Sequence, residues 1–121
     1  MKQIDLVRGY EALKRLSSES LPISDAYGIF TLCKQTEPQY MFEMEQEKKI
    51  LSEVNGTIAE NGDLHFDTLQ KAKEFQEKLN ELQDMDVSLE IKPITIKMGR
   101  LNQVRIRPED FEFLAPFVTF E

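Results

Sequence analysis

Apolar side chains recur every three or four positions along two stretches, and this spacing predicts two amphipathic helices. In residues 22–54 the repeating positions are Ile23, Tyr27, Phe30, Cys33, Tyr40, Met44, Leu51 and Val54. In residues 67–85 they are Leu69, Ala72, Phe75, Leu79 and Leu82. Between the two stretches, residues 57–66 place an Asn61-Gly62 turn between apolar residues, which predicts a β-hairpin. A connection this short implies that the two helices pack antiparallel.

Breaks in the pattern predict where these helices bend and end. Pro38 lies inside the first stretch, and a proline there removes one backbone hydrogen bond. We therefore expect a kink, or a short break near residues 35–38 that leaves two helical segments. Asn55-Gly56 predicts the C-cap of this long kinked helix. For the second helix, Asp67 is predicted as the N-cap, with Gln70 reaching back in a capping box.

The flanking segments predict shorter elements. Residues 5–17 carry a helical apolar stripe, and Asp5 is its expected N-cap. From Val87 the apolar period changes to two, so residues 87–107 are predicted to form two or three short strands. Pro108 opens a helical turn over residues 108–115. The expected fold is a single α+β domain, 1–121, dominated by helices: an antiparallel helical hairpin with a small antiparallel β-sheet and a C-terminal helical turn.

Four phenylalanines make the end of the chain strongly apolar: Phe111, Phe113, Phe117 and Phe120. A tail of this kind is costly to leave in water. It either packs back onto the core, which is the favoured interpretation, or docks onto a partner.

Charge is unevenly distributed over the 121 residues, whose net charge is −7. Residues 21–86 hold fourteen acidic and six basic groups, so the excess of acid belongs to the helical unit. By contrast, residues 92–107 hold five basic groups and no acid. No apolar run is long enough to span a membrane, and the first residues lack the apolar core of a signal peptide. The single cysteine, Cys33, excludes an internal disulfide and is expected in the core.

Known catalytic patterns are missing from the chain. The chain has one histidine, His65, and one cysteine. These are too few for an ordinary zinc site, and they leave no spare histidine or cysteine beyond a single Cys-His pair. The five glycines form no phosphate-binding loop. Glu90-Ile91-Lys92 has the acid-x-Lys form of one nuclease superfamily, with Asp63 or Asp84 as the second acid only by assumption. We expect no catalytic, cofactor or metal site and no enzyme.

Protein partners are the more plausible ligands. The candidate partner-binding residues are Glu43, Glu45, Glu47, Lys97, Arg100, Arg105, Phe117 and Phe120. The acidic residues could occupy a nucleic-acid-binding groove on an enzyme, whereas direct nucleic-acid binding is disfavoured because the acidic body would repel it. The apolar residues near Met44 could extend helix packing to a second subunit, giving a homo-oligomer.

The order of several short motifs resembles a family of small proteins encoded by tailed bacteriophages and prophages of Gram-positive bacteria. The motifs are Asp5-Leu6-Val7-x-Gly9-Tyr10, Leu21-Pro22-Ile23-Ser24, Phe75-Gln76-x-x-Leu79-Asn80-Glu81-Leu82, Asp86-Val87-x-Leu89-x-Ile91-x-Pro93-Ile94, Pro108-Glu109-Asp110-Phe111 and Leu114-Ala115-Pro116-Phe117. The resemblance covers nearly the whole chain. It implies a phage or prophage origin and supplies no site residues.

Together these observations predict a non-catalytic phage protein that acts through protein–protein contacts, in virion or tail assembly or as an accessory factor. The alternative is a host-directed inhibitor, an anti-defence or host-takeover protein, that binds a bacterial enzyme through its acidic helical face. Either protein would act in the host bacterial cytoplasm, or in association with the virion, without a membrane.

Overall fold

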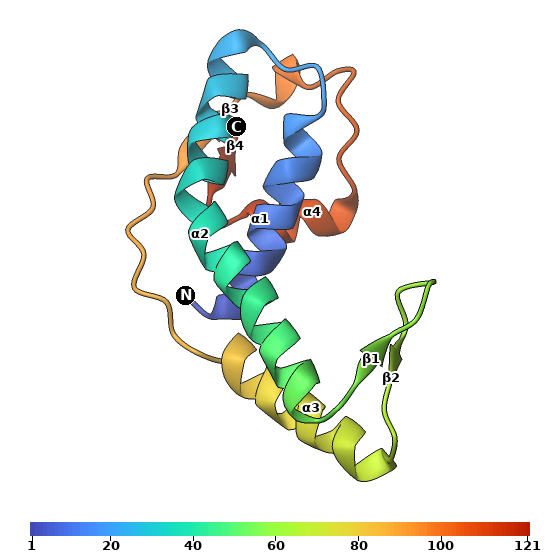
Figure 1. Cartoon of the computed structure of the whole chain (residues 1–121). Helices are drawn as coiled ribbons and strands as arrows, with labels where there is room; N and C mark the ends of the chain where they lie inside the picture. The colour runs from blue at the N-terminus through green and yellow to red at the C-terminus, as the bar shows by residue number, and fades with distance from the viewer.

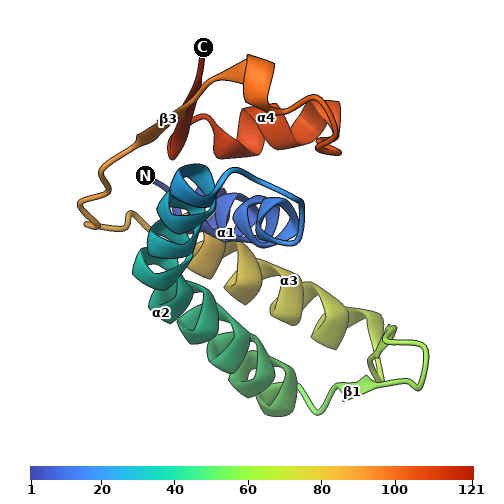
Figure 2. The same ribbon diagram turned by 90° about the horizontal axis from the view of Figure 1, so that it is seen from above.

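The computed structural model describes all residues, 1–121, and confirms a helix-dominated α+β fold (Figure 1). The helices are α1 (Gln3–Ser17), α2 (Ile23–Glu53), α3 (Leu69–Gln83) and α4 (Pro108–Leu114). The strands are β1 (Thr57–Ile58), β2 (Leu64–His65), β3 (Ile94–Ile96) and β4 (Val118–Phe120), and a 3-10 turn covers Met98–Arg100. Helix α1 lies between α4 on one side and α2 with α3 on the other (Figure 2).

The long helix α2 is continuous through Pro38, so the predicted break into two segments is wrong. Pro38 is exposed, and so is Lys34, whose carbonyl would otherwise accept a bond from the backbone of position 38. A carbonyl on this face can turn to water, which explains why the proline is tolerated. The predicted end of the helix is correct, because Asn55 takes the left-handed conformation, with φ 56°, beyond the Val54 C-cap.

The two predicted N-caps are shifted from their observed positions. Helix α1 begins after Lys2, which places Asp5 inside its first turn. A negative charge there interacts favourably with the helix dipole. Helix α3 is capped by Thr68, whose hydroxyl accepts the Lys71 N–H at 3.2 Å. Asp67 lies one residue earlier and pairs with the Lys71 ammonium at 3.7 Å. Sequence alone placed both caps within a few residues because several polar side chains precede each helix.

The predicted hairpin is present as the antiparallel pair β1–β2, with Ile58 opposite Leu64. The Ala59 N–H donates to the Asp63 carbonyl at 2.8 Å, which leaves Glu60, Asn61 and Gly62 as the loop. Gly62 has φ 88°, the left-handed conformation that a three-residue hairpin loop needs at this place.

Residues 87–107 contain one strand, β3, so the prediction of two or three strands there is wrong. Strand β3 pairs in parallel with β4 from the C-terminal tail, with Ile94 opposite Val118. The half-buried side chains of Val87, Leu89 and Ile91 account for the alternating pattern without belonging to a sheet. An alternating pattern shows that one side of an extended segment is covered, but it does not show which backbone pairs with it.

Two apolar clusters hold the fold together. The larger cluster joins α1, the N-terminal half of α2, β3, α4 and β4, and it includes Cys33 as expected. The smaller one joins the end of α2 to α3 through Ile50, Leu51, Val54 and Phe75. The predicted α2–α3 hairpin is therefore present (Figure 2), but most of the core lies between α1 and α2.

Candidate functional site

The predicted acidic face of α2 is only partly on the surface. Glu43 is 1% exposed, so its prediction as a partner contact is wrong. It follows Ile29 and Thr36 at steps of seven residues on the buried side of the helix, and Ile50 continues the row. Glu45 is exposed and Glu47 is half-buried. Thr36 and Glu43 are polar residues in the middle of this buried row. Their polarity led the sequence analysis to place this side of α2 on the surface.

Glu43 belongs to a polar cluster buried where α1, α2 and α3 meet. Gln3 is fully buried and donates its amide N–H to the Gln39 carbonyl at 3.0 Å, while Oε1 of Gln3 and Oε1 of Glu43 have no partner. Burial raises the pKa of the Glu43 carboxyl, and the neighbouring Glu47 charge raises it further. Burial also raises the pKa of Glu47. The cluster favours a protonated carboxyl inside the protein, with no role in surface binding.

The predicted basic residues lie on the segment between β3 and α4. Lys97, Arg100 and Arg105 are all exposed. Arg100 is 3.9 Å from the buried carboxylate of Asp25, and the Arg105 backbone N–H donates to the Glu19 carboxylate at 2.6 Å. The segment lies at the end of the molecule away from the β1–β2 hairpin (Figure 1). All three side chains therefore lie on the surface, while the hydrogen bond to Glu19 holds the backbone at Arg105 in place.

Phe117 is wrongly predicted as a partner contact, because its side chain is fully buried in the larger cluster. Phe120 is half-buried, and its ring meets Phe111 edge-on, with the ring centroids 5.0 Å apart. The aromatic tail thus packs back onto the core, as the favoured interpretation of the sequence expected.

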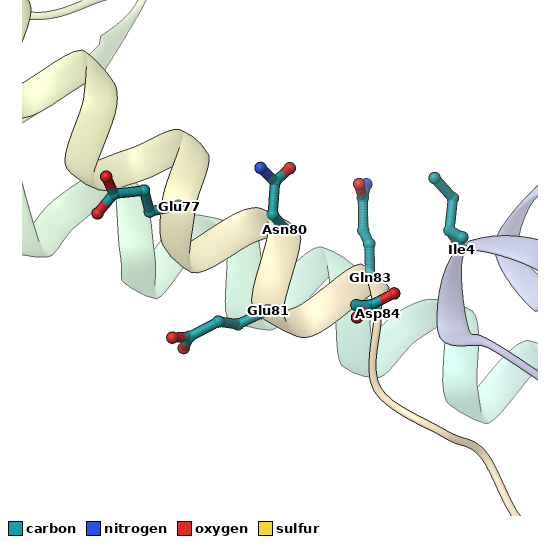
Figure 3. A pocket seen from close by; sticks show the side chains of 6 residues that line it. All are labelled: Ile4, Glu77, Asn80, Glu81, Gln83 and Asp84. Carbon is teal, nitrogen blue, oxygen red and sulfur yellow. The ribbon is translucent and has the colours of Figure 1, made fainter.

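A shallow hollow lies at the end of α3 and is acidic. It is lined by Ile4, Glu77, Asn80, Glu81, Gln83 and Asp84. In Figure 3 the Glu81 side chain extends away from Asp84, so these two carboxylates do not converge. Asp84 is already paired with the Lys2 ammonium at 3.0 Å. No group of three or more potential ligand side chains in the chain could hold a metal ion. The hollow offers a negatively charged surface with few apolar contacts.

The most unusual surface is one that the sequence analysis assigned to the core. Ile23, Tyr27 and Phe30 are 89%, 69% and 53% exposed, and Met41 further along the helix is 48% exposed. Together with Lys34, Glu37, Met44 and Lys48 they form a row that we call the outer face of α2. Within this row the rings of Tyr27 and Phe30 stack with their centroids 6.4 Å apart. The Lys34 ammonium lies 5.7 Å from the Phe30 ring centroid.

The N-terminal half of α2 has apolar residues on two sides, which is the signal that could have revealed the outer face. The buried side is formed by Ile29, Leu32 and Cys33. A single stripe through Ile23, Tyr27 and Phe30 accounts for only some of the apolar residues. A chain this small has too few other helices and strands to bury both apolar stripes of α2. Two stripes therefore predict that one of them stays exposed.

The chain was compared with known proteins. The comparisons with protein-family models, curated proteins and solved structures each returned no match. None of the helices combines the length and the apolar character that crossing a membrane requires. Among the surfaces described above, the outer face of α2 brings together four exposed large apolar side chains, those of Ile23, Tyr27, Phe30 and Met41.

Proposed function

We propose that this chain is a non-catalytic phage or prophage protein that acts through protein–protein contacts in virion or tail assembly, or as an accessory factor. The observation that supports this is the outer face of α2, where Ile23, Tyr27 and Phe30 are exposed within two turns. Contiguous exposed apolar side chains mark interaction surfaces, whereas isolated ones do not. The sequence resemblance supports the phage origin, and the host bacterial cytoplasm or the virion is the proposed location.

The test is capture of partners from phage-infected cells, followed by mass spectrometry. The wild-type chain is expected to recover virion structural proteins or other phage proteins, and Tyr27→Ser with Phe30→Ser is expected to lose them. Leu69→Ser is the matched control, because Leu69 is 75% exposed but lies on α3. Equal recovery by all three proteins would contradict the proposed use of the outer face.

The second candidate function is inhibition of a host enzyme, and the acidic surface of α3 favours it. Glu77 and Glu81 are exposed and line the hollow in Figure 3, and Glu45 is exposed separately on α2. Binding through such a surface should weaken as salt screens the charges. Recovery of one host enzyme that is lost at high salt, and lost when Glu77 and Glu81 are changed to lysine, would support the inhibitor. Glu90→Lys, at an exposed position outside this surface, is the control.

A further inference from the structure

The outer face of α2 has the spacing of a coiled-coil seam. Its positions follow one another by alternating steps of four and three residues: Ile23, Tyr27, Phe30, Lys34, Glu37, Met41, Met44 and Lys48. This alternation keeps one row of side chains along a helix facing a second helix. Because α2 is continuous from Ile23 to Glu53, the row is unbroken over about 38 Å.

Helix α1 borders one side of this row, because Lys14 and Ser17 line a hollow with Phe30, Lys34 and Glu37, but the Phe30 and Lys34 side chains stay exposed. Helix α1 packs on the side that carries Ile29 and Leu32, and β3 packs at Gly28, where Ile94 lies close to the backbone. Helix α3 meets the end of α2 at Ile50 and Leu51. In Figure 2, α1 and α3 lie on one side of α2, and the extended segment between α3 and β3 passes the N-terminal half of α2 on another side. The seam is thus complete in spacing but lacks its second helix.

The seam is complementary to itself when two copies of α2 run antiparallel. Placing Lys34 opposite Glu37 of the second copy also places Glu37 opposite the other Lys34, so two ion pairs form at the twofold axis. The same register sets Phe30 against Met41 and Tyr27 against Met44, and sulfur–aromatic contacts are favourable. Ile23 then meets the aliphatic stem of Lys48. Each position finds a partner of fitting chemistry without any adjustment of register.

The residues that flank the seam support the same arrangement. In the antiparallel register the exposed Glu45 faces the neutral Ser24 of the second copy. In a parallel pair every residue would meet its own counterpart, which sets Lys34 against Lys34 and Glu37 against Glu37. Like charges at facing positions weaken helix pairing. The charge pattern therefore selects the antiparallel orientation.

We propose that the outer face of α2 binds the outer face of a second copy of this chain, forming an antiparallel, twofold-symmetric dimer. This inference rests on the proposed function, because it names the partner of the surface on which that function was based. A closed twofold contact of this kind uses the same patch on both copies.

The first test uses charge exchange at the centre of the seam, measured by sedimentation velocity over a range of protein concentrations. Lys34 and Glu37 form an exposed intrahelical pair at 3.6 Å, so single substitutions should leave the monomer folded. Lys34→Glu alone, or Glu37→Lys alone, should raise the dimer dissociation constant at least tenfold. The Lys34→Glu/Glu37→Lys double variant should restore it, and so should an equimolar mixture of the two single variants. Leu69→Ser should leave it unchanged.

The second test fixes the orientation through disulfide formation. A mixture of Tyr27→Cys and Met44→Cys chains should form a mixed disulfide on oxidation. Tyr27→Cys alone should not, because in the antiparallel register the two copies of position 27 are about 25 Å apart along the axis. Rapid cross-linking of Tyr27→Cys with itself would indicate a parallel pair and overturn the proposed arrangement.

The outcomes separate this inference from the proposed function. A wild-type chain that stays monomeric at several hundred micromolar overturns the dimer, as does a dimer unaffected by the charge exchanges. If the monomeric chain still captures phage proteins and loses them with Tyr27→Ser and Phe30→Ser, the proposed function stands with a different partner. If the dimer forms as described but no phage protein is recovered, the inference stands and the assembly role fails.

Discussion

Asp110 is a buried carboxylate held between two arginines that come from different elements. Arg15 of α1 donates to its two oxygens at 2.7 and 3.3 Å, and Arg107 approaches one of them at 3.5 Å. Burial on its own would raise the pKa of Asp110, but the hydrogen bond and charge of Arg15 outweigh it and hold that pKa below its ordinary value. This ion pair joins α4 to α1.

Changing Arg15 to methionine should lower the free energy of unfolding by about 2 kcal/mol at pH 7, because it leaves a buried charge with one weaker partner. A carboxylate with a lowered pKa stabilises the fold above its unfolded-state pKa of about 3.9, and this contribution is lost as the pH falls through the folded-state value. Urea denaturation at pH 7 and at pH 3 should therefore show the difference shrinking with acid. Lys14→Met, at an exposed position of α1, is the control; an equal loss there would contradict the role of the ion pair.

Glu43 has the opposite pH dependence, because burial raises its pKa. The folded state then holds the proton more tightly, so the stability of the wild-type chain falls as the pH rises from about 4.3 through the folded-state pKa. Glu43→Gln removes the buried charge and should stabilise the protein at pH 8 by about 1 kcal/mol, with a much smaller effect at pH 4. Thermal unfolding at both pH values measures this. Glu45→Gln on the exposed side should change little, and a pH-independent effect at position 43 would contradict the explanation.

At the scale of elements, two helical glycines occupy different surroundings. Gly9 of α1 lies directly under the ring of Phe117, and a Cβ at this position would overlap that ring. Gly28 of α2 faces the end of the Ile94 side chain, with 2.9 Å from a built Cβ to its Cδ1 atom. A fully buried ring cannot move easily, whereas the end of a flexible, half-buried side chain can.

Gly9→Ala and Gly28→Ala should therefore have opposite effects although both exchange glycine for a better helix former. At position 9 the overlap with Phe117 should cost about 1–3 kcal/mol and exceed the gain in helix propensity. At position 28 the gain of up to about 1 kcal/mol should largely remain. Chemical denaturation of the two variants measures the change in the free energy of unfolding. Equal changes would show that helix propensity alone determines the effect of each substitution.

The elements that sequence could predict are those fixed by local spacing. The helices, the hairpin and the end of α2 at Asn55 depend on residues near one another in the chain, and all were found. The buried side of α2 was misassigned because Thr36 and Glu43 occupy core positions that a local pattern assigns to water. The pairing of β3 with β4 was missed because its partner lies beyond α4, where no local pattern reaches. Because the buried side of α2 was misassigned, the sequence analysis also missed that Ile23, Tyr27 and Phe30 are exposed.

At the scale of the whole molecule, the two apolar clusters differ in size and should differ in stability. The larger cluster contains eleven buried residues, and the one at the end of α2 contains four. Helix α3 contributes a single buried residue, Phe75, to the smaller cluster. Regions with few buried apolar contacts open more readily than the rest of a protein.

Hydrogen exchange should therefore show α3 and the β1–β2 hairpin exchanging faster than α1 and the N-terminal half of α2. Leu51→Ala, in the smaller cluster, should speed exchange in α3 and the hairpin while leaving α1 protected. Leu13→Ala, in the larger cluster, should lower protection everywhere because it weakens the global fold. Uniform protection across α1 and α3 in the wild-type chain would show that the molecule opens as one unit.

The contact between Phe117 and Gly9 joins segments that are far apart in the sequence, and this separation bears on the order of folding. Arg15 and Asp110, in the same pair of elements, are 95 positions apart, so docking α4 and β4 onto α1 closes a loop that contains most of the chain. Long closures are slow, whereas α1 and α2 are neighbours in sequence and can pair early. Refolding should thus pass through a stage in which the helices are formed and the site for Phe117 on α1 is still open to water. During that interval the apolar surface of α1 that Phe117 covers stays exposed, so a slower docking step should leave more time for aggregation.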